Sequence, residues 1–87
     1  MLRIPTIKTK YLGPTNTKGS RMKATRVGYH NKSIIIPFNY EHDNYENHQT
    51  VMRELIARYF PEFINSPVCA SDRIDQGFVF LIDIRGY

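Results

Sequence analysis

The sequence has one cysteine, Cys69, and no tryptophan among its 87 residues. A single thiol excludes a disulfide within the chain and a metal site built from several cysteines of one chain. The sequence also lacks an apolar run of roughly 18 residues, the length that a membrane helix requires. Residues 1–10 lack the apolar stretch of a secretory signal. We therefore expect a soluble, cytoplasmic protein with no membrane partner.

Acidic residues are missing from the first 40 positions, although the chain carries a net charge of +4. Eight basic residues lie in residues 1–32, and the first acidic residue is Glu41. A cationic segment of this kind favours an anionic ligand, phosphate-bearing ligands above all. The alternative is a solvated basic face that only aids solubility.

Catalytic and metal-binding motifs are also missing. The sequence has no Gly-x-Ser-x-Gly and no His-x-x-x-His, and Cys69 does not stand in a recognisable Cys–His motif. The three histidines, His30, His42 and His48, are irregularly spaced. We therefore expect a binding protein rather than an enzyme, with no cofactor and no metal.

What is present predicts one small α+β domain over residues 1–87, because a chain of this length has room for one core. Alternating apolar and polar residues predict strands at 6–12 and 21–27. The β-branched run Ile34-Ile35-Ile36 predicts a third strand at 33–38, with Pro37 at a sheet edge or bend. Asp43 and Glu46 form a capping-box pattern for a helix that ends at Pro61. Residues 60–76 are expected to be irregular, and the apolar run at 77–84 predicts a last strand buried on both faces.

The predicted order is β-β-β-α-β, with a small, mostly antiparallel sheet packed on one main helix. One helix covers one face of the sheet, so the apolar side chains on the other face of the last strand need a cover. A second copy of the protein is the simplest cover, and we therefore expect a homo-oligomer. The alternative is that residues 60–76 fold over that face.

The loop between the first two strands concentrates the polar chemistry of the chain. Its hydroxyls, carboxamide, cations and glycines are suited to an anion cradle, with Arg21 able to make a bidentate phosphate contact. It is not a Walker loop, because Lys18 precedes Gly19 and a strand follows. The alternative is a long hairpin whose side chains satisfy their own backbone. The candidate ligand-binding residues are Thr15, Asn16, Thr17, Lys18, Gly19, Ser20 and Arg21.

Two further residues complete the candidate site. His48 lies on the apolar stripe of the helix near its amino end, where the helix dipole favours a neutral imidazole that can hydrogen-bond a ligand. The alternative for His48 is a core histidine with its hydrogen bonds satisfied. Tyr11 is a candidate for stacking on a nucleotide base, with Tyr29, Phe38, Tyr40 and Tyr45 as other aromatic candidates.

The block TKYLGPTNTKGSRMKA at residues 9–24 resembles the opening of a widespread group of small proteins encoded by bacteriophages and mobile elements. The likeness continues in Glu46-Asn47-His48 and in Gly77-Phe78-Val79-Phe80, so it spans most of the chain. The chain departs from the group in its helix, which is not alanine-rich, and at residues 73–76, where the group has a more glycine-rich approach to the last strand.

The resemblance implies a phage anti-defence protein that acts as a sponge for cyclic oligonucleotide signals of the CBASS type, in the cytoplasm of the host cell. Such a protein binds a cyclic di- or trinucleotide without cleaving it and commonly holds it between protomers. Two alternatives remain from the residues themselves. One is a nucleic-acid-binding module that lays its basic hairpin on DNA or RNA. The other is an inhibitor of a host complex, similar in action to an anti-CRISPR protein.

Overall fold

The computed structural model of the chain describes residues 4–84, apart from the side chains of His30 and Asn31. Its elements follow the order β-β-β-α-β-β, so the predicted α+β class is confirmed with one strand more than expected. The single domain over residues 1–87 stays a prediction, of which the structure covers residues 4–84. In chain order the elements are β1 (Thr6–Leu12), β2 (Arg21–Arg26), β3 (Tyr29–Pro37), α1 (Asn44–Tyr59), the 3-10 helix η1 (Pro61–Phe63), β4 (Val68–Ile74) and β5 (Gly77–Ile82).

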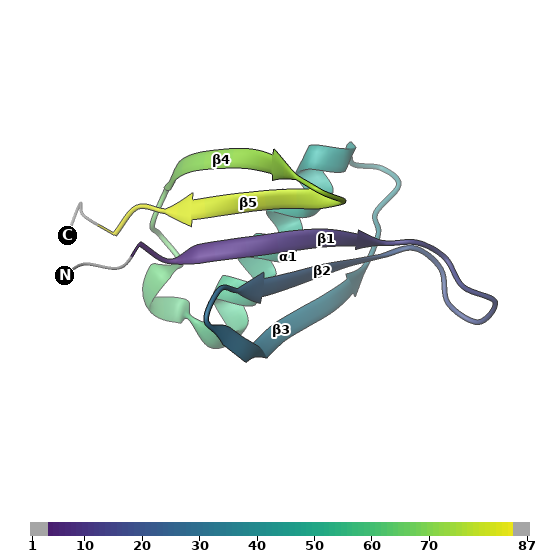
Figure 1. Cartoon of the computed structure of the whole chain (residues 1–87), viewed down its shortest axis with the longest axis horizontal. Helices are drawn as coiled ribbons and strands as arrows, with labels where there is room; N and C mark the ends of the chain where they lie inside the picture. Colours follow the sequence, from purple (N-terminus) through teal and green to yellow (C-terminus); the bar gives the residue numbers. More distant parts are fainter. Residues whose placement is uncertain (1–3, 85–87) are drawn as a thin grey trace.

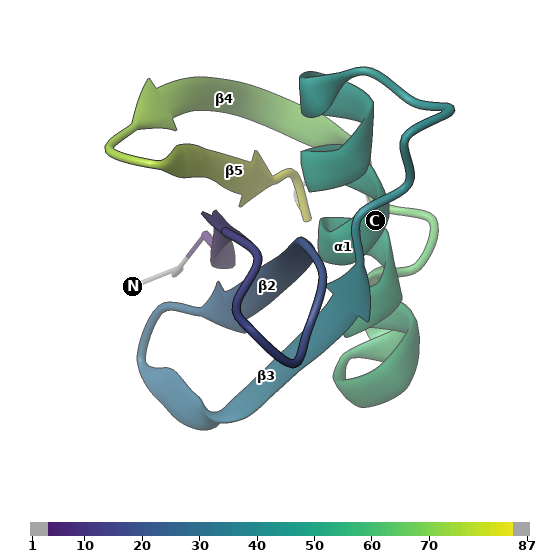
Figure 2. The same ribbon diagram turned by 90° about the vertical axis from the view of Figure 1, so that its right-hand side faces the viewer.

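The five strands form one antiparallel sheet with the order β3-β2-β1-β5-β4 (Figure 1). β1 is the central strand and pairs with β2 on one side and β5 on the other. The helix α1 lies across one face of this sheet and contacts β1, β2, β3 and β5 (Figure 2). We call this the helix face and the opposite side the open face.

The core lies between α1 and the helix face of the sheet. Ile7, Met22 and Phe80 come from three neighbouring strands, and they are fully buried against an apolar stripe of the helix. Burying each of these large side chains stabilises the fold by about 1.5–3 kcal/mol. The helix residues of this core are Val51, Met52, Leu55 and Ile56.

The amino end of α1 has the predicted capping box. Oδ1 of Asp43 accepts a hydrogen bond from the backbone N–H of Glu46 at 2.8 Å, and Oε1 of Glu46 accepts one from the N–H of Asp43 at 3.0 Å. These bonds satisfy backbone donors that a helix start leaves without intrahelical partners. They fix the point at which the chain enters the helix, directly before Asn47 and His48.

The strand β4 corrects the expectation that residues 60–76 are irregular. Its interior side chains are exposed, so they lack the apolar alternation by which a strand is recognised in a sequence. The strand forms because its backbone pairs with β5 along the sheet edge. This segment therefore widens the sheet and does not fold over the open face.

The other edge of the sheet agrees with the sequence. Pro37 is the last residue of β3, which is the edge strand next to β2, and a residue without a backbone N–H is tolerated there.

The last strand, β5, was predicted to be buried on both faces, but its burial differs between them. Phe80 and Ile82 are fully buried on the helix face, whereas Val79 and Leu81 on the open face are half-buried. Among residues 4–84, no helix is long and apolar enough to cross a membrane.

Candidate functional site

The open face of the sheet carries a cluster of lysines at its centre. Ile7, Thr9 and Tyr11 of β1 point to the helix face, so Lys8 and Lys10 point to the open face. Register places Lys10 directly opposite Lys23 of β2, on the same face. The helix therefore leaves three ammonium groups uncovered on neighbouring strands.

The Lys10–Lys23 pair is a like-charge pair within one sheet. Residues directly opposite each other in antiparallel strands have Cβ atoms about 4.5–5.5 Å apart, and like charges placed so destabilise the sheet. Neither lysine has an ion pair or side-chain hydrogen bond with any residue in the described range 4–84. An anion bound between them would remove this repulsion.

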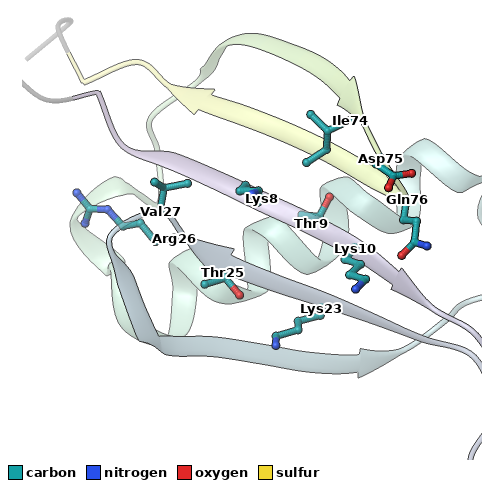
Figure 3. A pocket seen from close by; sticks show the side chains of 10 residues that line it. All are labelled: Lys8, Thr9, Lys10, Lys23, Thr25, Arg26, Val27, Ile74, Asp75 and Gln76. Carbon is teal, nitrogen blue, oxygen red and sulfur yellow. The ribbon is translucent and has the colours of Figure 1, made fainter.

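A shallow groove of about 590 Å³ lies over these lysines. Figure 3 shows Lys8, Lys10 and Lys23 on the side of the sheet that faces away from the helix. The turn after β2 borders the groove through Val27, and the β4–β5 turn borders it through residues 74–76. The volume falls within the range of roughly 300–1,000 Å³ that is typical of small-molecule sites.

The groove lining is cationic but chemically mixed. Thr25 contributes a hydroxyl, Gln76 a carboxamide and Ile74 an apolar side chain, while Asp75 is the one carboxylate among the residues that line it. Lysine binds phosphate as a flexible point charge, and hydroxyl and amide groups add directional hydrogen bonds. The groove can therefore bind a ligand that combines anionic and neutral polar groups.

Arg26 also borders the groove, but its guanidinium contacts aromatic rings. Its Cζ lies 4.2 Å from the ring centroid of Tyr29, 4.7 Å from that of Phe60 and 5.3 Å from that of Phe63. A cation over aromatic faces at these distances is stabilised by the ring quadrupoles. Arg26 therefore connects the turn after β2 to the end of the helix. The positive charge available to a ligand in the groove comes from the three lysines.

The predicted polar loop extends beyond the sheet as an arm, which runs to the right of β1 and β2 in Figure 1. Its residues from Gly13 to Gly19 are exposed, and none of them lines the groove. Oγ1 of Thr15 accepts hydrogen bonds from the N–H of Lys18 at 3.0 Å and of Thr17 at 3.4 Å. Thr15 thus stabilises the turn of the arm, whereas the side chains of Asn16, Thr17 and Lys18 are exposed.

At the base of the arm, Tyr11 and Ser20 are joined. The hydroxyls of the two residues lie 2.8 Å apart, and the ring of Tyr11 packs edge-on against Phe38 with centroids 5.7 Å apart. Arg21 begins β2 opposite Leu12, and its Nε is buried without a hydrogen-bond partner among the residues that the structure describes. The predicted site residues are therefore divided between an exposed tip and a packed base.

His48 faces the sheet, as its place on the helix stripe predicts. The residue is 1% exposed, and its Nδ1 lies 2.7 Å from Oγ1 of Thr9 on the central strand. Its ring also packs against Phe78, with centroids 4.8 Å apart. Burial lowers the pKa of His48 below its ordinary value, so the imidazole is neutral at neutral pH.

Next to His48 lies a second, smaller cavity of about 160 Å³ on the helix face. Tyr11 and His48 both line it, together with Arg73 and Gln76 from the β4–β5 hairpin and Phe78 at the start of β5. Tyr11, His48 and Phe78 lie far apart in the sequence, and the fold brings them together at this cavity.

Asn47, the neighbour of His48, is buried and has a structural role. Its Oδ1 accepts a hydrogen bond from the N–H of Asn39 at 2.8 Å, and its Nδ2 donates to the carbonyl of Asn39 at 2.8 Å. The residue therefore closes the loop between β3 and α1 onto the helix. Because Asn47 fixes the start of the helix against this loop, its neighbour His48 is held opposite Thr9.

Sequence reasoning missed several lining residues of the two cavities. The alternation of β1 and β2 does put Lys8, Lys10 and Lys23 opposite the apolar positions, which is a readable signal for a basic face. Arg73 and Gln76 carry no such signal, because they belong to the strand and turn that the sequence pattern does not predict.

No protein-family model matches this chain, and neither does any curated protein or solved structure with which it was compared. Within residues 4–84 no group of three or more histidine, cysteine or acidic side chains is placed to hold a metal ion.

Proposed function

We propose that the protein binds a cyclic oligonucleotide in the groove on the open face of its sheet and holds it without cleaving it. The observation that carries the proposal is the Lys10–Lys23 pair, flanked by Lys8, in a groove of about 590 Å³. A ligand with two or three phosphodiesters supplies the negative charge that this cluster lacks.

The neutral groups of the groove support a nucleotide rather than a simple anion. Thr25 and Gln76 offer hydrogen bonds for sugar or base, and Ile74 and Val27 offer apolar contact at its borders. Ligand sites commonly combine apolar surface with a few polar groups that fix orientation. On this proposal the protein acts as the sponge that the resemblance implies, depleting a host signal of the CBASS type.

Calorimetry against a panel of cyclic di- and trinucleotides tests the proposal. We expect saturable binding of at least one member, and recovery of that nucleotide intact by chromatography after incubation. A charge-assisted hydrogen bond contributes about 1.5–3 kcal/mol, so losing one lysine contact weakens binding roughly tenfold to a hundredfold. Lys10→Gln with Lys23→Gln should therefore weaken binding at least tenfold.

A charge-matched control distinguishes the groove from general attraction. Lys32 lies on the helix face, with its Nζ 5.1 Å from the ring centroid of Tyr59, and Arg58 is exposed on α1. Lys32→Gln with Arg58→Gln removes the same net charge and should change affinity less than threefold. Absence of saturable binding to every member of the panel contradicts the proposal.

One observation favours a second candidate, a single-stranded or duplex nucleic acid. The arm carries the exposed Lys18 beyond the end of the sheet, on the same hairpin that carries Lys10 and Lys23. A polyanion long enough to follow this hairpin would contact both the groove and the arm. Affinity that rises with oligonucleotide length, falls steeply with salt and drops in Lys18→Gln would favour this candidate over the cyclic nucleotide.

A further inference from the structure

The small cavity on the helix face is lined by a buried histidine with one ring nitrogen unpaired. Nδ1 of His48 is taken by Thr9, and Nε2 makes no hydrogen bond with any residue in the range 4–84. His48 is almost wholly buried and lines the cavity. A polar group in this state needs either water or a ligand as its partner.

The short contact between Nδ1 of His48 and Oγ1 of Thr9 is compatible with either tautomer of the imidazole, because the hydroxyl can donate to Nδ1 or accept from it. The contact of Oγ1 with the carbonyl oxygen of Phe78, at 3.4 Å, is at the long limit of a hydrogen bond and does not fix the direction. Nε2 therefore presents either an N–H or a lone pair to the cavity.

Hydrogen-bond donors line the same cavity. Arg73 lies opposite Phe78 in the β4–β5 pair, is exposed, and has no ion pair with a described residue. Gln76 adds a carboxamide, and Tyr11 and Phe78 add aromatic rings. An imidazole nitrogen beside a guanidinium complements a planar group that carries a carbonyl oxygen next to a ring nitrogen.

The cavity is the right size for one base. Its volume of about 160 Å³ corresponds to the liquid volume of roughly five water molecules. This space is on the scale of a nucleobase. Arginine pairs with the oxygen-bearing edge of guanine more often than with any other base edge, and guanine places a ring N–H beside that oxygen.

Gln76 connects the cavity with the groove on the open face, because it lines both. It has a φ of 63°, a left-handed conformation that residues other than glycine rarely adopt. Its carbonyl accepts a hydrogen bond from the N–H of Tyr11 at 3.0 Å, which ties this turn to β1. Asp75 and Gln76 form the two-residue turn between β4 and β5, and tight turns of this kind commonly place a residue at positive φ.

We propose that this cavity is a guanine subsite, in which Nε2 of His48 hydrogen-bonds a ring nitrogen of the base and Arg73 donates to the carbonyl oxygen beside that nitrogen. The inference rests on the proposed function, because the phosphates of the same ligand occupy the groove on the open face. The base enters around the β4–β5 turn, past Gln76.

The test is calorimetry with two probes, a cyclic dinucleotide of guanosine and one of adenosine. Wild-type protein should bind the guanosine probe at least tenfold more tightly. The exposed Arg73→Gln should abolish most of this preference and leave affinity for the adenosine probe within threefold. Arg58→Gln is the matched control and should keep the preference.

A spectroscopic readout tests His48 in the wild-type protein, without a variant that risks the core. In ¹⁵N-labelled protein, the Nε2 resonance of His48 should move on addition of the guanosine probe and stay within line width on addition of the adenosine probe.

The outcomes separate the two proposals. If both probes bind with equal affinity, or if Arg73→Gln weakens both equally, the guanine subsite is wrong and the groove proposal stands. If neither probe binds but another cyclic nucleotide does, the subsite is again wrong. If no cyclic nucleotide binds at all, both proposals are wrong.

Discussion

Lys10 and Lys23 lie directly opposite each other across β1 and β2, on the face of the sheet that α1 leaves open. The arrangement sets two lysine side chains on neighbouring strands of one face, and neither forms an ion pair with a residue in the range 4–84. A surface of this kind is less stable empty than occupied by an anion. This relationship connects the fold of the protein to the function proposed for it.

The ligand-free protein should become more stable when the repulsion between residues 10 and 23 is replaced by attraction. Lys23→Glu places a carboxylate directly opposite Lys10, and opposite charges in such cross-strand positions contribute about 0.2–1 kcal/mol. We expect the free energy of unfolding in urea to rise by this amount at low salt, and the gain to shrink at high salt. Binding of cyclic nucleotides should be lost in the same variant, and a gain in both properties would contradict the role given to the pair.

The stability of the protein should depend on pH through His48. Its pKa is lowered by burial from the ordinary 6.5, so the unfolded chain takes up a proton at a higher pH than the folded chain. The free energy of unfolding should therefore be highest above pH 6.5 and should fall as the pH drops toward the lower folded pKa.

Urea unfolding between pH 7.5 and 5.5 measures this dependence. His48→Gln should flatten the slope, whereas His42→Gln, at an exposed position, should keep it. An unchanged slope in His48→Gln would show that another group controls the stability in this range.

Gly77 should not tolerate even the smallest side chain. A Cβ at this position would overlap the backbone carbonyl oxygen of Thr9 on the central strand, and neither strand can move without breaking the β1–β5 pairing. We expect Gly77→Ala to destabilise the protein by roughly 3 kcal/mol or more, at or above the upper end of typical overpacking effects. Thermal unfolding measures the change, and a loss below 1 kcal/mol would show that the two strands separate more easily than the structure indicates.

Two other glycines form a matched pair for backbone conformation. A Cβ at Gly28 or at Gly19 would meet no heavy atom within 4 Å, but only Gly28 has a left-handed φ, of 89°. Gly28→Ala should therefore destabilise the turn between β2 and β3 by about 1–2 kcal/mol. Gly19→Ala should leave the free energy of unfolding unchanged or slightly raised, because it only restricts the unfolded chain. Equal effects at both positions would contradict this explanation.

Much of the fold follows from local sequence patterns. β1, β2 and the helix carry apolar periodicity, β5 is a continuous apolar run, and Asp43 and Glu46 mark the helix start. β4 carries no such pattern, since its exposed side chains contribute little burial and the strand depends on backbone pairing with β5. Because the prediction lacks this strand, it also does not identify Arg73 and Gln76 as residues that line a cavity.

The candidate site was only partly predictable for a related reason. The basic character of residues 1–32 points to an anionic ligand, but the pairing of Lys10 with Lys23 depends on strand register, which the sequence pattern alone does not fix. His48 and Tyr11 were predicted, and the structure places them at one cavity. The loop tip from Thr15 to Gly19 remains a predicted ligand contact, but it lies on an arm whose residues do not line the groove.

The central claim, that the ligand occupies the open face of the sheet, is tested most directly by nuclear magnetic resonance. Titration of ¹⁵N- and ¹³C-labelled protein with the guanosine cyclic dinucleotide should shift the side-chain signals of Lys8, Lys10 and Lys23 and leave those of Lys32 in place. Shifts confined to residues 15–19 of the arm, or no shifts at ligand concentrations in the millimolar range, would contradict the account.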